Sequence, residues 1–403
     1  MLDELNALIA FLVALAGSAA LTPVVKKLAL RAGVVDKPRD RGLSNRLVPL
    51  LGGIAILSGV VLAAIVELPD SSATRAILGG AVVITAVGAL DDRFELPALV
   101  KFIGQVGAAL IPVLAGVVVT DFTLPFVGHV DLGDAAEPLT LLGLVFLMNV
   151  VNFSDGVDGL AAGVCTISAL AFAVIAFDLG QNAAAVLAAL TAGAALGFLF
   201  YNFNPASIFM GDSGANLLGY LLGCVAVQGT LKTNAVIALV FPLVILAVPF
   251  VDTTFVVLKR IKYRKPVYAA DRWHLHHRMA NIGFSQRRTV LYLYGWTVIM
   301  AGLAVALRFV PYSDNHGHLH AGWAVLMVAL GLLALAASIY LVYVLEILKF
   351  RRLRSLALRK DDPATSEHEI DDEVRRELET GEYEAIRPED GHTPRAPTPQ
   401  PRR

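Results

Sequence analysis

FLMNVVNFSDGVDGLAAG, residues Phe146–Gly163, begins as an apolar helix and ends in a ladder of polar side chains. The ladder has four members at three-residue intervals: Asn149, Asn152, Asp155 and Asp158. Residues three apart are neighbours on a helix surface, so the ladder gives one end of an apolar helix a polar edge. A glycine follows each of the two acids. Such an edge needs a reason in a chain that is otherwise strongly apolar.

The composition of the whole chain indicates a membrane protein. Of its 403 residues, 56% are hydrophobic and 17% are charged, which is too little polar surface to cover a water-soluble protein. Apolar runs of about twenty residues, the length that crosses ~30 Å of hydrocarbon, recur along the chain. We predict an all-α, polytopic integral membrane helix bundle of about eleven spans: 5–25, 50–67, 74–90, 99–118, 138–154, 160–178, 183–201, 213–230, 235–257, 289–310 and 321–346.

The predicted loops alternate between the two sides of the membrane, and most basic residues lie in the loops of one side. They are concentrated in residues 26–46 and 259–288, whereas the opposite loops hold little beyond Lys232. Because positively charged residues near span ends stay cytoplasmic, the N-terminus is expected outside and the C-terminus inside. The first run has an acidic flank and is too long for a signal-peptide core, so it counts as a span.

Composition also divides the chain in two. Residues 1–350 form the predicted transmembrane domain with its cytosolic loops, and residues 351–403 a basic juxtamembrane segment and a polar tail. A tail of this composition cannot bury enough apolar surface to fold, so we expect it to be disordered in the cytoplasm. The net charge of −1 gives no reason to expect nucleic acid as a partner. Cys165 and Cys224 fall inside predicted spans without CxxC spacing and are expected in the core.

Four polar segments fall at the cytosolic ends of predicted spans. They are residues 88–105, the ladder segment, and residues 201–220 and 271–294. A carboxylate at the centre of a membrane helix costs roughly 2.5–3.5 kcal/mol, so acids near hydrocarbon are kept for sites, pathways or ion pairs. Their position at one membrane boundary suits an enzyme that uses a cytosolic substrate and a membrane lipid.

The residue types narrow the chemistry further. Asp91 and Asp92, with the Asn and Asp residues of the ladder, offer only oxygen ligands, which is typical of a hard divalent ion such as Mg²⁺. The cluster HLHHR at 274–278 could be a zinc site, but no Cys or carboxylate at zinc-ligand spacing accompanies it. Its cationic side chains suit hydrogen bonds to phosphate. Metal-binding oxygens beside a phosphate-binding cluster indicate phosphoryl transfer.

Each segment alone also has a simpler interpretation. Paired acids at a helix end can be a solvated cap, and FMGDSGAN at 209–216 can be a turn that caps the next helix. The HLHHR cluster can be a patch that contacts lipid headgroups. The presence of all four segments at one membrane face favours a common site.

These segments resemble the polyprenyl-phosphate N-acetylhexosamine-1-phosphate transferase family, the WecA and MraY superfamily of glycosyltransferase 4 type. The resembling patterns are DDxxxLxxxxK, NxxNxxDGxDGL, NxxPAxxFMGDxG and a basic His loop, in that order between about Asp36 and Tyr294. The resemblance implies transfer of a sugar 1-phosphate from a UDP-sugar to a polyprenyl phosphate, with release of UMP. HLHHRMANIGFSQRRTVLYLY is similar to the WecA and TagO branch, which acts on UDP-N-acetylglucosamine (UDP-GlcNAc).

The resemblance also implies residue roles by position. Mg²⁺, or Mn²⁺ in its place, would be bound by Asn152 and Asp212. Phe209 would stack on uracil, while Asn202 and Asp158 hold the nucleoside. Five residues would contact phosphates: Lys101, His274, His276, His277 and Arg278. The implied catalytic residues, which would order the site and assist the attacking lipid phosphate, are Asp91, Asp92, Asp155 and His276.

The implied partners are UDP-GlcNAc, undecaprenyl or decaprenyl phosphate, and membrane lipid, and a homodimer is compatible with the family. The implied location is the bacterial inner membrane, with the active site facing the cytoplasm, at the first membrane step of a cell-envelope polysaccharide. Two alternatives stay open. One is a phospho-MurNAc-pentapeptide transferase on the same fold. The other is a secondary transporter, which would place its substrate groups near the bilayer midplane.

Overall fold

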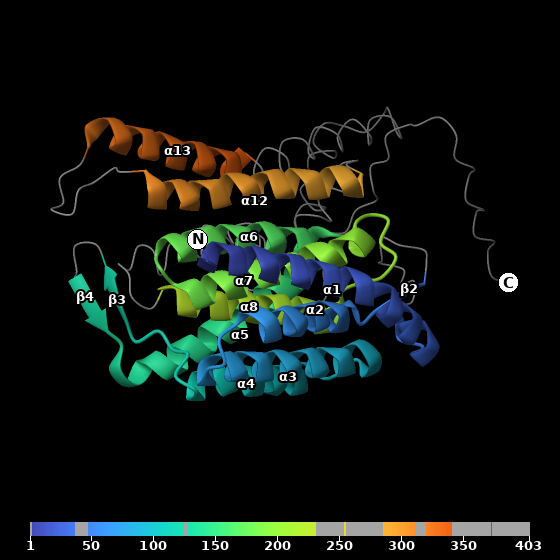
Figure 1. The fold of residues 1–403 in the computed structure, drawn as a ribbon. Helices are drawn as coiled ribbons and strands as arrows, with labels where there is room; N and C mark the ends of the chain where they lie inside the picture. The colour runs from blue at the N-terminus through green and yellow to red at the C-terminus, as the bar shows by residue number, and fades with distance from the viewer. Residues whose placement is uncertain are drawn as a thin grey trace, which may run out of the picture.

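The computed structural model of the protein describes residues 2–36, 47–124, 128–230, 285–310 and 320–340, and the single residues Thr254 and Asp372. These residues form mainly helices (Figure 1). The helices are α1 (Leu2–Ala32), α2 (Gly52–Glu67), α3 (Ser72–Phe94), α4 (Ala98–Leu114), the short 3-10 turn η1 (Gly133–Ala135), α5 (Ala136–Ser154), α6 (Leu160–Asp178), α7 (Asn182–Asn202), α8 (Gly211–Thr230), α12 (Gln286–Phe309) and α13 (Ala321–Ile339).

Two short antiparallel strand pairs accompany the helices and were not predicted. β1 (Val35–Asp36) pairs with β2 (Val48–Pro49), and β3 (Asp121–Leu124) pairs with β4 (Gly128–Asp131). With two to four residues each, these strands are too short to give a periodic hydrophobic pattern in the sequence. They join helices and leave the helical architecture unchanged.

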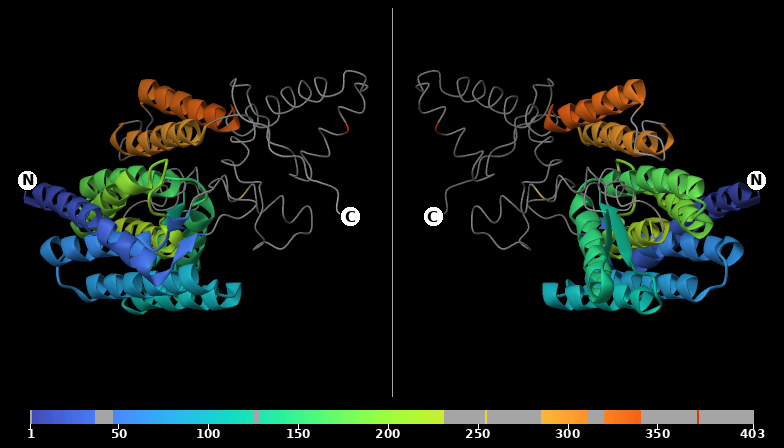
Figure 2. Two further views of the ribbon diagram at one scale, coloured as in Figure 1. Left: turned by 90° about the vertical axis from the view of Figure 1, so that its right-hand side faces the viewer. Right: turned by 90° about the vertical axis from the view of Figure 1, so that its left-hand side faces the viewer.

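The helices lie side by side in one bundle (Figures 1 and 2). In its centre, α7 packs against α1, α6 and α8. On one side of this centre, α8 contacts α3 and α5, and α4 contacts both of these helices. On the other side, α12 covers α6 and α13 packs against α12. The helices α3, α4, α5 and α8 thus form a ring in which each helix packs against two of the others, which matters for the polar segments described below.

Helices are present at every predicted span that falls within the described residues. Seven of the described helices are long and apolar enough to cross a membrane, whereas α2 and α4 are shorter apolar helices. The following predicted features lie outside the described residues: the span at 235–257 except Thr254, the end of the last span, the HLHHR cluster and almost all of the tail. A polytopic helical membrane protein is therefore confirmed, and the count of eleven spans stays a prediction.

The first helix differs most from its prediction, because α1 continues beyond residue 25 to Ala32. The extra turns carry Lys26, Lys27 and Arg31, which ended the apolar run in the sequence. Lys and Arg are good helix formers, so a helix can leave the hydrocarbon without being interrupted. Apolar run length therefore predicts the part of a helix that lies in lipid better than it predicts the whole helix.

Close packing of small residues holds the centre of the bundle together. A Cβ atom at Gly193 of α7 would lie 2.1 Å from the carbonyl oxygen of Phe11 in α1, so no larger residue fits there. Neighbouring Ala192, Ala194 and Ala195 are fully buried. Lipid is as apolar as the helix surfaces, so membrane helices associate largely through such close contacts. The Ala-rich and Gly-rich sequence of α7 is accounted for by this contact with α1.

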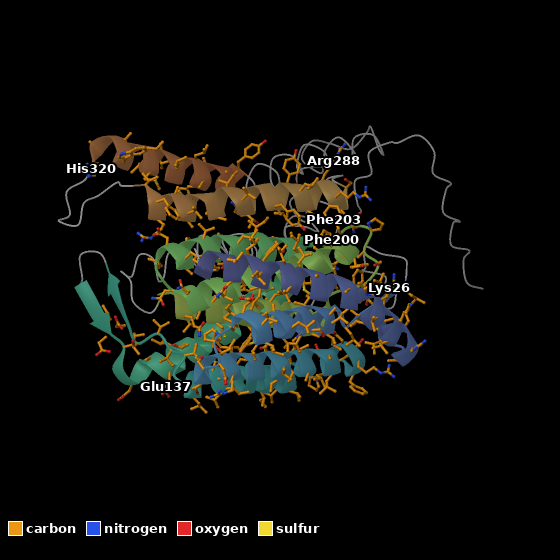
Figure 3. The ribbon with its side chains drawn as sticks, viewed as in Figure 1. Lys26, Glu137, Phe200, Phe203, Arg288 and His320 are labelled. Carbon is orange, nitrogen blue, oxygen red and sulfur yellow. The ribbon has the colours of Figure 1, made fainter. Side chains whose placement is uncertain are left out.

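The two ends of the bundle differ in the residues that they carry. Figure 3 shows Lys26 and Arg288 at one end, and Glu137 and His320 at the other. Arg287, beside Arg288, donates from Nε to the carbonyl oxygen of Asn204 (2.9 Å). The loop 203–210 between α7 and α8 therefore lies at the end that carries Lys26 and Arg288, which we call the basic end.

Candidate functional site

Lys101 of α4 lies at the centre of the candidate site. Its Nζ atom donates to Asp212 Oδ2 at the start of α8 and lies 3.3 Å from Asp91 Oδ2 near the end of α3. Asn152, in the last turn of α5, completes the group. With its amide oriented to satisfy both neighbours, its oxygen accepts from Lys101 Nζ (3.0 Å) and its nitrogen donates to Asp212 Oδ1 (3.1 Å). Four helices thus meet in what we call the lysine cluster: Asp91, Lys101, Asn152 and Asp212.

The lysine cluster is partly shielded from water. The side chains of Lys101, Asp91 and Asp212 are 19%, 14% and 27% exposed. Electrostatic attraction between partly buried groups is screened less than attraction between exposed groups. The cluster is therefore a polar group of mixed charge that a charged substrate can still reach. The sequence predicts that the four polar segments meet, and the lysine cluster brings together residues from three of them.

Asp92 holds the start of α8 against the end of α3. Its Oδ1 accepts from the backbone N–H of Asp212 (2.7 Å), and its Oδ2 accepts from that of Ser213 (3.3 Å). The first N–H groups of a helix lack partners inside it and attract negative charge. Gly211 has φ +68° and a Cβ there would lie 2.4 Å from Asp92 Oδ2, so a side chain would displace this carboxylate. Asp92 thereby fixes the position of Asp212.

Asp158, the last member of the ladder, holds the loop 203–210. Its Oδ2 accepts from Asn204 Nδ2 (3.0 Å) and from the backbone N–H of Ala206 (2.9 Å). Asn202 is 3% exposed and spans the same region: its Nδ2 donates to the carbonyl oxygen of Ile208 (3.0 Å) and its Oδ1 accepts from the N–H of Gly159 (3.0 Å). These contacts shape the loop, and the expected contacts of both residues with a nucleoside stay predictions.

Phe209 is held at its backbone and keeps a partly exposed side chain. Its N–H donates to the carbonyl oxygen of Pro49 (2.8 Å), and its own carbonyl oxygen accepts from the N–H of Gly52 (3.1 Å). The segment 49–52 thus fixes the loop directly before α8. The ring is half-buried and therefore accessible in part. Its predicted stacking on a base stays a prediction.

Asp155 follows the last turn of α5, and its N–H donates to the carbonyl oxygen of Asn152 (3.2 Å). Removal from water, and secondarily the charges of Asp92 and Asp158, raise the pKa of Asp155 to about 7. A carboxyl group with this pKa can take up or release a proton at neutral pH. The three acids lie close enough to influence one another, although none of these effects could be read from their spacing.

Helix α12 brings a fourth segment to the same loop. Gln286 Oε1 accepts from Asn204 Nδ2, and Tyr294 donates from its hydroxyl to the carbonyl oxygen of Gly159 (2.5 Å). These contacts join the start of α12 to both the ladder turn and the loop 203–210. The predicted phosphate-binding residues directly before α12 lie outside the described residues: His274, His276, His277 and Arg278. Their roles stay predictions.

The described residues of the cluster fit a small divalent cation in one respect. Asn152 and Asp212, the predicted metal ligands, present amide and carboxylate oxygens to a cation, which in this structure is the ammonium group of Lys101. Within the part of the chain that the structure describes, no group of three or more His, Cys, Asp or Glu residues could hold a metal. Two protein oxygens are still sufficient for Mg²⁺, which commonly takes one or two protein ligands and completes its shell with substrate phosphates and water.

Three residues of the site are not among those predicted from the sequence: Gln105, Asn204 and Asn216. Asn204 was hidden in a loop where no periodic pattern applies, yet it contacts Asp158, Gln286 and Arg287. Gln105 and Asn216 lie four residues after Lys101 and Asp212, which is one turn along the same helix face. That spacing was a usable signal, because polar residues inside apolar runs are rare and costly.

Comparison with known sequences identifies similar proteins. The sequence pattern of glycosyl transferase family 4 matches residues 74–230, a range that holds every member of the lysine cluster. The chain is 39% identical over 312 residues to a probable undecaprenyl-phosphate N-acetylglucosaminyl 1-phosphate transferase of Bacillus subtilis, covering 76% of this chain and 87% of that protein.

More distant relatives carry related names. A decaprenyl-phosphate N-acetylglucosaminephosphotransferase of Mycolicibacterium smegmatis is 37% identical over 319 residues, covering 71% of this chain and 79% of the relative. An undecaprenyl-phosphate alpha-N-acetylglucosaminyl 1-phosphate transferase of Escherichia coli is 28% identical over 302 residues, covering 71% of this chain and 80% of the relative. The similarity therefore extends over most of each protein and includes the candidate site.

Proposed function

Since this chain belongs to glycosyl transferase family 4, we propose that it transfers N-acetylglucosamine 1-phosphate to a polyprenyl phosphate, with UDP-GlcNAc as the donor. The names of its relatives support the acceptor and the transferred group. The observation that carries the proposal is the meeting of Asp91, Lys101, Asn152 and Asp212 around one ammonium group. Such a group can bind phosphates and a cation at the end of a membrane helix bundle.

The proposed reaction is a phosphoryl transfer. An oxygen of the lipid phosphate forms a bond to the β-phosphorus of UDP-GlcNAc, and the bond from that phosphorus to the oxygen bridging to the α-phosphorus breaks. The products are UMP and a polyprenyl diphosphate that carries GlcNAc. By analogy with phosphorylated side chains, the second pKa of the lipid phosphate is about 6, so the nucleophile is largely ionised at neutral pH. Positioning and charge neutralisation are then the main tasks of the protein.

Each member of the lysine cluster has a part in this reaction. Lys101 places a positive charge beside the phosphates, and Asp91 keeps its ammonium group in place from 3.3 Å. Asn152 and Asp212 would hold Mg²⁺, which when bound supplies positive charge that stabilises the diphosphate and the leaving UMP. Asp155, whose pKa is about 7, can accept a proton that remains on the lipid phosphate. These assignments leave the HLHHR cluster to contact the remaining phosphate oxygens.

The choice of donor is tested by incubating the purified protein in detergent with polyprenyl phosphate, Mg²⁺ and one of two nucleotides. We expect UMP release with UDP-GlcNAc and none above background with UDP-MurNAc-pentapeptide. Chelation of Mg²⁺ should stop the reaction and its replacement should restore it. A reaction without polyprenyl phosphate serves as the control. UMP release with the pentapeptide donor but not with UDP-GlcNAc would instead assign the chain to the other branch of the superfamily.

We place the active site on the cytoplasmic face of a bacterial inner membrane, because the basic end of the bundle carries Lys26 and Arg288. The test uses Arg288→Cys and, at the opposite end, His320→Cys, both at exposed positions. Cys165 and Cys224 are buried and should stay unlabelled in the parent protein. In intact spheroplasts, an impermeant maleimide should label His320→Cys at once, and Arg288→Cys only after permeabilisation. The reverse order of labelling would invert the proposed topology.

A further inference from the structure

A second polar group lies directly beneath the lysine cluster. Its members are Gln105 of α4, Asn149 of α5 and Asn216 of α8, which we call the amide triad. Gln105 follows Lys101 by four residues, Asn149 precedes Asn152 by three, and Asn216 follows Asp212 by four. Each is therefore about one helical turn further from the basic end than a member of the lysine cluster on the same helix.

Side-chain hydrogen bonds join the three amides. Gln105 Nε2 donates to Asn216 Oδ1 (2.8 Å) and, over a longer distance, to Asn149 Oδ1 (3.4 Å). Asn149 Nδ2 donates back to Gln105 Oε1 (2.9 Å) and to the carbonyl oxygen of Val145 (2.8 Å). Asn216 Nδ2 donates to the carbonyl oxygen of Asp212 (2.8 Å). The triad is thus linked to the lysine cluster through the backbone of Asp212.

Burial gives these bonds a strong influence on helix orientation. Gln105 and Asn216 are each 1% exposed, among apolar side chains. An amide in such a place is unfavourable unless its hydrogen bonds are made, and hydrogen bonds need specific distances and angles. Apolar contacts between helices, in contrast, tolerate small rotations and shifts. Three amides joined through Gln105 therefore favour one rotation of α4, α5 and α8 about their axes over slightly different rotations.

We propose that the amide triad positions the lysine cluster, by fixing the rotation and register of the three helices that carry Lys101, Asn152 and Asp212. A rotation of α4 that broke the bond from Gln105 to Asn216 would also turn Lys101 away from Asp212. Gln105, Asn149 and Asn216 are positioning residues in this view, because the lysine cluster lies between them and any substrate. The inference rests on the proposed function only for its effect on turnover.

The first test replaces the whole triad with leucine: Gln105→Leu, Asn149→Leu and Asn216→Leu together. Removing all three amides leaves none of them unpaired, so the protein should still fold. We expect its unfolding temperature in detergent to stay near that of the wild type, while kcat falls by roughly tenfold to a hundredfold, since a misplacement of about 1 Å can cost a hundredfold. The KM for UDP-GlcNAc should change less than kcat.

Thr191→Val serves as the matched control for that test. Thr191 is fully buried in α7, and its hydroxyl donates to the carbonyl oxygen of Leu187 in its own helix (2.7 Å). This variant also loses a buried hydrogen bond but leaves the relation between helices unchanged, so its kcat should equal that of the wild type. A wild-type kcat in the triple-leucine variant would show that the triad contributes nothing to positioning.

The second test measures position without catalysis. Lys101→Cys and Asp212→Cys are combined in a background in which Cys165 and Cys224 are replaced by alanine, and the rate of cross-linking by a short bifunctional maleimide is followed in membranes. A bifunctional reagent is used because cysteine is shorter than lysine and would not bridge the same gap as a direct disulfide. We expect the rate to fall severalfold when the triad is replaced with leucine. Asp178→Cys with Arg308→Cys is the control pair, because these side chains form an ion pair at 2.5 Å between α6 and α12. Its rate should not change.

The two tests separate the inference from the proposed function. If the wild-type chain transfers nothing from UDP-GlcNAc, the proposed function fails while the cross-linking rate still decides the inference. If the cross-link forms at the same rate with and without the triad, the inference is wrong whatever the activity. Should the triple variant fail to accumulate, Gln105→Leu alone is used in both tests with the same expected directions, because Gln105 contacts both other members.

Discussion

Replacing Asp212 with Asn should reduce GlcNAc 1-phosphate transfer by roughly a hundredfold or more, because a metal ion or cationic group that stabilises developing charge is worth several kcal/mol. The substitution keeps the size of the side chain and removes its charge, which faces Lys101 and the proposed Mg²⁺ position. It leaves the fold intact, since the contacts of Asp212 with Asp92 and Asn216 use its backbone N–H and carbonyl groups.

The measurement for Asp212→Asn is kcat from UMP release, beside the unfolding temperature in detergent with and without Mg²⁺ and UMP. We expect the two ligands to raise the unfolding temperature of the wild type and to have little effect on the variant. Asp70→Asn is the matched control, because the Asp70 side chain is 81% exposed and pairs with Arg75 at the surface. Wild-type turnover and unchanged Mg²⁺ dependence in Asp212→Asn would remove Asp212 from the metal site.

Replacing Lys101 with Met should lower kcat by about tenfold to a hundredfold, as expected for the loss of one charge-assisted contact worth about 1.5–3 kcal/mol. Methionine fills a similar volume without the ammonium group. Asp91 and Asp212, which both approach that group, would then face each other as like charges and move apart. The fall in kcat should therefore have two causes: the lost contact with phosphate and the changed positions of Asp91 and Asp212.

The Lys101→Met result is compared with that for Lys27→Met. Lys27 is exposed at the end of α1, so its replacement removes the same charge from the basic end without touching the cluster. We expect wild-type kcat for Lys27→Met. If Lys101→Met also kept wild-type kcat, the ammonium group at the centre of the cluster would have no part in the reaction.

The helical architecture was predictable because membrane helices leave a strong signal in a sequence. About twenty apolar residues in succession are needed to cross the bilayer, and soluble loops rarely contain such runs. The ends of the helices were less predictable. The basic turns of α1 continue the helix to Ala32, because helix formation does not require an apolar environment.

The sequence indicates which residues belong to the lysine cluster but not how they contact one another. The sequence places Asp91, Lys101, Asn152 and Asp212 near the same ends of predicted spans, so their proximity followed from topology. It could not show that Asp92 would cap α8 through two backbone N–H groups, because that depends on which helices pack together. The nearly complete burial of Asn202 was hidden for the same reason.

The amide triad illustrates the difference between helical spacing and tertiary contact. Gln105 and Asn216 each lie one turn from a residue that the motifs emphasise. Their mutual contact requires α4 and α8 to be neighbours at the right depth, which no local pattern states. Sequence spacing can therefore nominate polar residues inside apolar helices, and the tertiary structure decides which of them meet.

The most direct test of the proposed reaction is the fate of the β-phosphorus of UDP-GlcNAc. The purified protein is supplied with polyprenyl phosphate, Mg²⁺ and donor labelled at that phosphorus, and the lipid and aqueous products are separated. If GlcNAc 1-phosphate is transferred, the label enters the lipid fraction in equal amount to the UMP released. Label that stays in water as UDP, with GlcNAc on the lipid, would show transfer of the sugar without its phosphate and contradict the proposed function.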